Sequence, residues 1–130
     1  MKPLTQPPDN QQAFDAVIQH FLIEKNDRSQ DSDGDCLLRG PHGRMCAVGL
    51  LFPDTLYRST MENAPVFELL GHEVLRSWFS QCTPDLLAEL QRWHDEGVWD
   101  PLGFESVKRL GMIAAQFNLD VSKVPVLEFQ

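Results

Sequence analysis

Cys36-Leu-Leu-Arg-Gly-Pro-His-Gly-Arg-Met-Cys-Ala-Val48 is the stretch that decides the expected fold class. Its outer runs, residues 36–39 and 44–48, are rich in apolar side chains and have the length of short strands. Between them stands Gly-Pro-His-Gly, four residues that favour turns. Two strand-like runs joined by such a turn are typical of a β-hairpin. We therefore predict a hairpin over residues 36–48.

A helix is predicted on the N-terminal side of this segment. Asp9 stands three residues before Gln12, which is the spacing of a capping box at a helix start. Large apolar residues then recur with the period of one helix face, namely Phe14, Val17, Ile18, Phe21 and Leu22. We expect this helix to run from Asn10 to about Lys25. Residues 26–35 have no apolar side chain and are predicted to form a solvated loop.

Two further long helices are predicted on the C-terminal side. Thr83 followed by Pro84 offers a capping hydroxyl and a first helical position that needs no N–H donor. Gly97 can end this helix in the left-handed conformation. The last helix is expected from about residue 104 to residue 117. A short helix is expected over residues 54–58, where a proline precedes the segment.

The chain is predicted to be one domain over residues 1–130, with a flexible tail at residues 1–8. With 130 residues, 42% of them apolar, it can bury roughly two-thirds of its surface without metal or disulfide staples. Residues 121–130 alternate apolar side chains, so they form either a third strand at a sheet edge or a free tail. The predicted fold class is α+β, mainly helical with a small β-hairpin.

The charge balance limits the kinds of partner. Acidic residues outnumber basic ones by 19 to 11, which gives a formal net charge of −8. This charge repels a phosphate backbone, so we expect no direct nucleic-acid binding, and it favours proteins with a basic surface. Arg39, His42 and Arg44 are the local group that could contact an anion. The chain has neither a membrane-length apolar run nor a secretory core, so we predict a cytoplasmic protein without membrane contact.

Cys36, His42 and Cys46 lie close together in the sequence and could supply three ligands of a zinc site. The fourth ligand would come from Cys82, His72 or His94. Structural zinc sites usually pair their ligands at short spacings, and Cys36 and Cys46 do not have such a spacing. We therefore expect no metal and no other cofactor, and we expect reduced, buried thiols at the three cysteines.

A thiol nucleophile is the kind of catalysis that the sequence permits. Cys46 could attack a substrate with His94 as its base, because cysteine catalysis needs an imidazole that takes the thiol proton. Asp95 follows His94 directly, and adjacent helix residues point about 100° apart. We expect Asp95 to stay in solvent rather than to orient the ring. In such an enzyme Arg39 and Arg44 could hold an anionic substrate.

An acidic and aromatic stretch offers a different kind of site. Trp93 and Trp99 flank Asp95, Glu96 and Asp100. Aromatic anchors rimmed by acid suit an interface with a basic protein, so we predict that these five residues bind a partner. The alternative is that they are the solvated side of a helix and its following loop.

Two blocks of the sequence carry a recognisable pattern. The first is Cys36-x-x-Arg-Gly-Pro-x-Gly-x-x-Cys-Ala-Val-Gly49, continued by Leu51-Phe-Pro-Asp-x-Leu-Tyr57. The second is Leu90-Gln-x-x-His-Asp95, followed by Trp99, Leu110, Ala114 and Asn118-Leu119. In this order the two blocks resemble small uncharacterised proteins of tailed bacteriophages and prophages. The resemblance implies a phage or prophage context and a bacterial host, and it implies no particular activity.

Together these features favour a binding protein over an enzyme, since the familiar catalytic motifs are absent. We expect a phage-encoded acidic protein that modulates a host protein. The sharpest form of this hypothesis is an inhibitor of a CRISPR-type defence complex that mimics nucleic acid. The first alternative is a small cysteine- or metal-dependent enzyme using Cys46 and His94. The second is a phage structural or assembly factor.

Overall fold

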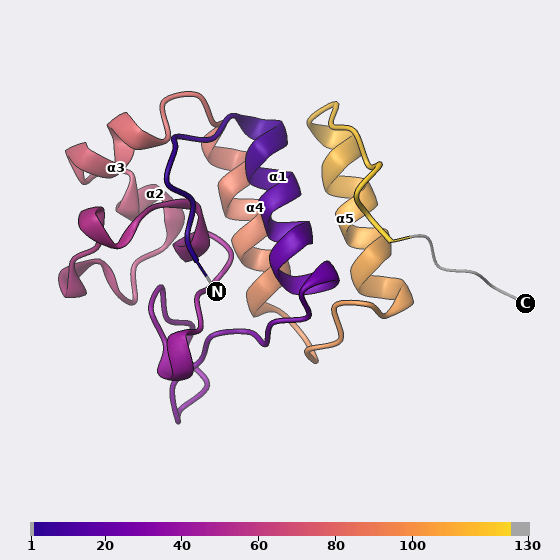
Figure 1. Ribbon diagram of the computed structural model, residues 1–130, viewed down its shortest axis with the longest axis horizontal. Coiled ribbons are helices and arrows are strands. Elements are labelled where there is room, and N and C mark those ends of the chain that lie inside the picture. The colour runs from indigo at the N-terminus through magenta and orange to yellow at the C-terminus, as the bar shows by residue number, and fades with distance from the viewer. Residues whose placement is uncertain (1, 126–130) are drawn as a thin grey trace, which may run out of the picture.

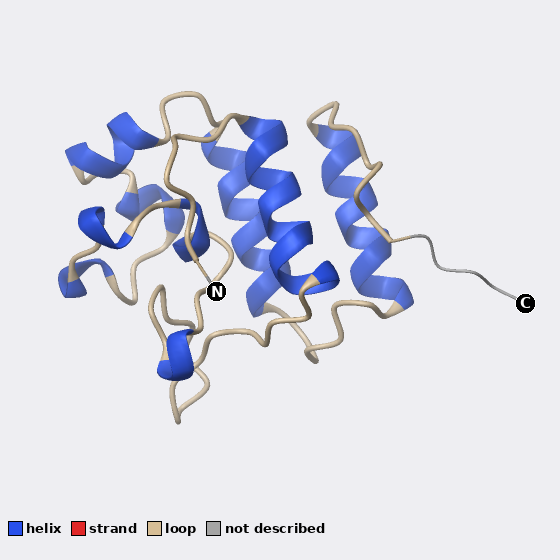
Figure 2. Ribbon diagram, in the orientation of Figure 1, coloured by secondary structure: helices blue, strands red, loops and turns tan. Residues whose placement is uncertain are grey.

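The computed structural model describes residues 2–125 and is built from helices and loops (Figures 1 and 2). Three long helices lie side by side, with α4 in contact with the other two: α1 (Asn10–Ile18), α4 (Pro84–Asp95) and α5 (Phe104–Gln116). The rest of the chain forms short helices α2 (Val66–Leu69) and α3 (Glu73–Trp78), and 3₁₀ turns at Pro41–Gly43, Gly49–Leu51, Asp54–Leu56 and Ser59–Met61. None of the helices in residues 2–125 has the length and apolar character needed to cross a bilayer.

Helix α1 begins as the sequence predicts. The Asp9 carboxylate accepts the backbone N–H of Gln12 at 2.8 Å, and the Gln12 side chain accepts the N–H of Asp9 at 3.0 Å. A π-helical turn, Gln19–Ile23, continues the helix almost to the predicted end. All five residues of the predicted apolar stripe are at most 2% exposed. Burial of one continuous face therefore fixes this helix against the core.

Helix α4 also starts where predicted, but Thr83 acts differently from the expected cap. Its hydroxyl makes no bond to the first turn of the helix. Instead, Thr83 Oγ1 accepts the Asn10 side-chain amide at 2.9 Å, and the Thr83 N–H donates to Asn10 Oδ1 at 2.7 Å. This reciprocal pair joins the start of α4 to the start of α1. At the other end, Gly97 has the left-handed φ of 74° that the sequence predicted.

The predicted β-hairpin is absent, and the α+β fold class is therefore wrong. Residues 2–125 contain no strand, and the one β-bridge of residues 36–48 pairs Cys36 with Gln30 rather than with the second arm. The loop closes through Gly40 N–H and Arg44 O at 2.8 Å. His42 and Gly43 provide the turn, with φ of 60° and 75°.

Two side chains, Glu62 from outside the segment and Arg39 from within it, take hydrogen bonds that a hairpin ladder would need. The Glu62 carboxylate accepts the N–H of Leu38 at 2.7 Å and the N–H of Arg39 at 3.2 Å. The Arg39 guanidinium donates to the carbonyls of Leu38 and Gly49, and also to that of Phe52. Because residues 45–50 are all buried, this segment also lacks the one-sided burial of a hairpin arm. Satisfied backbone groups and burial therefore favour an irregular, closely packed loop.

The C-terminal segment forms a turn as far as it is described. The Val124 N–H donates to the carbonyl of Val121 at 2.9 Å, and residues 121–125 contain no strand. The remainder of the expected edge strand, residues 126–130, lies outside the described residues. At the opposite end, the Leu4 N–H donates to the Leu50 carbonyl at 2.8 Å.

His20 in the π-helical turn makes the stability of the fold depend on pH. Burial lowers its pKa from 6.5 to about 4, and its Nε2 has no hydrogen-bond partner. Below about pH 6.5 the unfolded chain therefore binds a proton at this position that the folded chain does not. We expect His20 by itself to lower the free energy of unfolding by about 2 kcal/mol between about pH 7 and pH 4.5, after allowance for partial solvent screening.

Urea unfolding of the wild type and of His20→Gln at both pH values checks this expectation. The variant should lose less stability on acidification than the wild type, whereas His42→Gln, at an exposed turn, should behave like the wild type. Equal pH dependence in the wild type and His20→Gln would show that His20 is not the responsible group.

Candidate functional site

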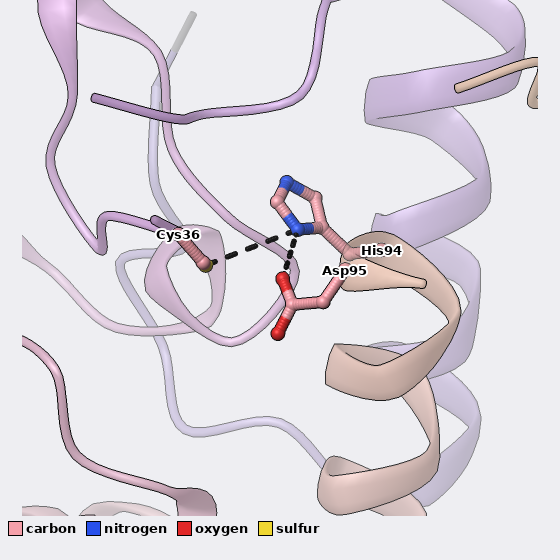
Figure 3. Close-up of side chains that lie close together, drawn as sticks. All are labelled: Cys36, His94 and Asp95. Carbon is pink, nitrogen blue, oxygen red and sulfur yellow. Dashed lines mark hydrogen bonds and ion pairs between the residues drawn. The ribbon is translucent and has the colours of Figure 1, made fainter. Parts of the chain in front are cut away.

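The C-terminal end of α4 meets the start of the irregular loop, at Cys36, in a cluster of three reactive side chains (Figure 3). His94 Nδ1 lies 2.7 Å from Asp95 Oδ1 and 3.9 Å from Cys36 Sγ. All three groups offer an atom within 4.8 Å of the others. A thiol, an imidazole and a carboxylate are thus brought together from segments 58 residues apart.

Gln91, one helical turn before His94, completes the cluster. Its Oε1 accepts the backbone N–H of Val48 at 3.0 Å, so its amide nitrogen must face the other way. That nitrogen lies 3.0 Å from Cys36 Sγ and 2.9 Å from Asp95 Oδ1. The amide therefore places a hydrogen-bond donor beside the sulfur.

The hydrogen bonds of His94 identify its neutral tautomer. The ring is fully buried, between Phe21 and Trp99, and its Nε2 accepts the backbone N–H of Ser29 at 3.2 Å. Because Nε2 offers a lone pair to this N–H, the hydrogen of the neutral ring is on Nδ1. It is donated to Asp95, which thereby fixes the orientation of the ring.

The expectation that Asp95 would stand apart from His94 was wrong. Asp95 is the last residue of α4, and the chain leaves the helix at Glu96. The Arg28 guanidinium donates to the carbonyls of His94, Asp95 and Gly97, so it holds this helix end against the loop. With the ring fixed by burial, the Asp95 carboxylate reaches back to Nδ1 while its side chain stays 38% exposed.

The surroundings set the protonation of the cluster. Hydrogen bonding with Cys46 and burial raise the pKa of the Cys36 thiol, against a lowering effect of His94. Burial raises the pKa of Asp95, but hydrogen bonds from His94 and Gln91 outweigh it and hold the pKa below its usual range. Burial lowers the pKa of His94, while Asp95 and Cys36 raise it by more. The resting cluster thus holds a protonated thiol beside the Asp95 carboxylate, which is the base within its reach.

A cleft of about 490 Å³ opens onto this cluster. Cys36, Gln91 and Asp95 line it together with Cys46, Glu62 and Leu38. Cys36 is half-buried, whereas Cys46 is fully buried and its Sγ accepts the N–H of Gly49 at 3.3 Å. The thiol accessible to a small molecule is therefore Cys36 and not the predicted Cys46.

The same three groups have the composition of a metal site, but their hydrogen bonds do not fit one. A metal ion would need a lone pair on His94 Nδ1, which in the neutral ring carries the hydrogen donated to Asp95. Moving that hydrogen to Nε2 would point it at the Ser29 N–H, so two donors would face each other and the hydrogen bond would be lost. Of the candidate zinc ligands that the sequence offered, His42 lies at an exposed turn and is not part of this cluster.

The residues predicted to contact an anion have structural partners. Arg39, besides the three carbonyls described above, pairs with Asp54 at 2.7 Å, and its side chain is only 17% exposed. It also lies over the rings of Phe52 and Tyr57. Arg44 pairs with Asp27 at 3.2 Å.

The residues predicted to bind a partner have different environments. Trp93 is 3% exposed and donates its indole N–H to the Ser106 carbonyl at 3.0 Å. Trp99 is partly buried and packs against Phe21. Glu96 and Asp100 are exposed, whereas Asp95 belongs to the cluster.

Part of this cluster has a signal in the sequence. Gln91, His94 and Asp95 stand at positions i, i+3 and i+4, which share one helix face. A face with an amide, an imidazole and a carboxylate is a reasonable catalytic candidate. The pairing with Cys36 has no such signal, because it depends on how the loop packs against α4.

No match to this chain is found among protein families, curated proteins or solved structures. The site is therefore interpreted from its own geometry.

Proposed function

We propose that this protein is a thiol-dependent enzyme that transfers or hydrolyses acyl groups, with Cys36 as the nucleophile. The observation that carries the proposal is the contact of Cys36 with the His94–Asp95 pair at the wall of a cleft. A thiol beside a carboxylate that a buried imidazole holds in place supplies a nucleophile with a base in reach, which thiol catalysis requires.

The proposed reaction assigns a role to each member of the cluster. Cys36 Sγ bonds to the carbonyl carbon of the substrate, and the Asp95 carboxylate, which hydrogen-bonds with Cys36 and is held by the N–H of His94, takes the thiol proton. The proton then passes to the leaving group as its bond to carbon breaks. Water hydrolyses the resulting thioester, which releases the acid and restores the thiol. The Gln91 amide, 3.0 Å from Sγ, can donate to the oxygen that becomes negatively charged.

The raised pKa of Cys36 has a kinetic consequence. Few molecules hold a preformed thiolate at neutral pH, so the proton must leave as the sulfur attacks. The rate of acylation should therefore depend on Asp95 and on the His94 ring that holds it, and not on the thiol alone.

Acetylation by p-nitrophenyl acetate tests the proposal, with p-nitrophenolate release and site-resolved mass spectrometry as readouts. We expect transient acetylation of Cys36 and catalytic turnover, both lost in Cys36→Ser. Cys82→Ser is the matched control, because Cys82 is buried and bonds to the Pro8 carbonyl. Acetylation of folded Cys36 no faster than in urea-unfolded protein would overturn the proposal.

The acidic binding protein remains a second proposal, directed at a host protein with a basic surface and most sharply at a CRISPR-type defence complex. One observation favours it: Val98 is 89% exposed, between the exposed acids Glu96 and Asp100. An apolar contact rimmed by acid suits a basic partner. If Glu96→Gln with Asp100→Asn left binding to such a partner and its salt dependence unchanged, this proposal would fail.

A further inference from the structure

The charge of the cleft differs from what an anionic substrate would need. The residues that line it include three acids, Asp35, Glu62 and Asp95, and no lysine or arginine. Arg39, which was a candidate to hold an anionic substrate, pairs with Asp54. Arg44, the other candidate, pairs with Asp27.

The three carboxylates have no lysine or arginine partner among residues 2–125. None of them forms an ion pair with a lysine or arginine there. Glu62 is held by neutral donors, namely two backbone N–H groups and the Tyr57 hydroxyl at 2.7 Å. Asp95 is held by His94 and by the Gln91 amide. Hydrogen bonds of this kind fix the carboxylates in place without cancelling their charge.

The acids surround a defined reaction centre. Cys36 Sγ lines the same cleft as the three carboxylates, so a bound molecule that reaches the sulfur lies within their field. A cleft with walls of low dielectric and one sign of charge concentrates ligands of the opposite sign. The net charge of −8 on the whole chain acts in the same direction.

We propose that the substrate is an acyl compound with a positive charge near its carbonyl, such as a peptide or ester with an ammonium or guanidinium group. This inference rests on the proposed thiol chemistry and names the substrate class of the same site. It replaces the anionic substrate expected from Arg39 and Arg44 with a cationic one.

Methanethiosulfonate reagents of opposite charge test the inference. Each transfers its thioalkyl group to Cys36 to form a mixed disulfide and releases methanesulfinate. The trimethylammonioethyl and sulfonatoethyl reagents are compared, and each rate at Cys36 is divided by that of the same reagent with neutral 2-mercaptoethanol. We expect the cationic reagent to react about tenfold faster or more after this correction at low salt, and the preference to shrink as salt is added.

Matched variants separate the effect of the cleft carboxylates on this preference from the effect of the net charge of the protein. Asp35→Asn removes one carboxylate from the exposed rim and should reduce the preference about two- to threefold. Glu105→Gln, which removes one charge on α5 away from this cleft, should leave it unchanged. A corrected ratio near one, or equal effects of the two variants, would overturn the inference.

The two proposals fail separately. If p-nitrophenyl acetate acetylates Cys36 but the charge preference is missing, the thiol chemistry stands and the cationic substrate is wrong. If the preference is present but Cys36 is not acetylated faster in the folded protein, the enzyme proposal fails, and with it the assignment of a substrate.

Discussion

Gly49→Ala is expected to lower the free energy of unfolding by about 3 kcal/mol or more. A Cβ at position 49 would lie 2.5 Å from the carbonyl oxygen of Leu38 and 3.0 Å from its Cα. These are backbone atoms, and they cannot turn aside as the end of a side chain can. The Leu38 N–H is held by Glu62 and its carbonyl by Arg39, so relief of the clash would break the bonds that organise the loop.

Urea unfolding checks this prediction, with Gly111→Ala as a matched control. Gly111 lies within α5, and a Cβ there would have nothing within 4 Å. Alanine should therefore raise stability by about 0.5–1 kcal/mol at this position. The same substitution is thus expected to have opposite signs at the two positions. A Gly49→Ala variant as stable as the wild type would show that the loop does not pack as described.

Gly49→Ala should also slow acetylation of Cys36. The Gly49 N–H donates to Cys46 Sγ, and Cys46 lines the same cleft and hydrogen-bonds with Cys36. A shift of the backbone at residue 49 would therefore displace Cys46, and with it the neighbouring thiol of Cys36.

Asp95→Asn is expected to reduce the rate of Cys36 acetylation roughly 10²- to 10³-fold. The Asp95 carboxylate accepts the hydrogen of His94 Nδ1. An asparagine amide that turned its NH₂ group to Nδ1 would favour the hydrogen on Nε2, where it would face the Ser29 N–H. If it turned its oxygen instead, the tautomer would be kept, but the carboxylate that takes the thiol proton would be gone.

The control for Asp95→Asn is Asp85→Asn, which makes the same change of charge in the first turn of α4. Its acetylation rate should equal that of the wild type. Because the Asp95 side chain is partly exposed, Asp95→Asn should stay folded, and urea unfolding verifies this. The rate of acetylation should also lose part of its dependence on pH. An unchanged rate and pH profile in a folded Asp95→Asn variant would remove Asp95 from the mechanism.

The long helices follow from the sequence, because their signals are local. The capping box of Asp9 with Gln12 and the apolar stripe of α1 act within one or two turns. Pro84 and Gly97 likewise mark the ends of α4 through their own backbone preferences. Such interactions depend little on the rest of the chain, so the pattern of residues was sufficient to predict them.

Tertiary structure alone decided the conformation of residues 36–48. The apolar runs and the turn are compatible with a hairpin, but the N–H groups of Leu38 and Arg39 bind the Glu62 side chain, more than 20 residues away. Propensity for a strand is a weak preference, and burial with competing hydrogen bonds readily overrides it.

The candidate site likewise has one part that the sequence predicts and one part that depends on tertiary packing. The helical spacing of Gln91, His94 and Asp95 could be read from the sequence. Their meeting with Cys36 could not, since it needs the loop to be fixed by Ser29 against His94 and by Arg28 against the end of α4. Local geometry thus placed three of the groups on one helix face, and only long-range packing brought the thiol to them.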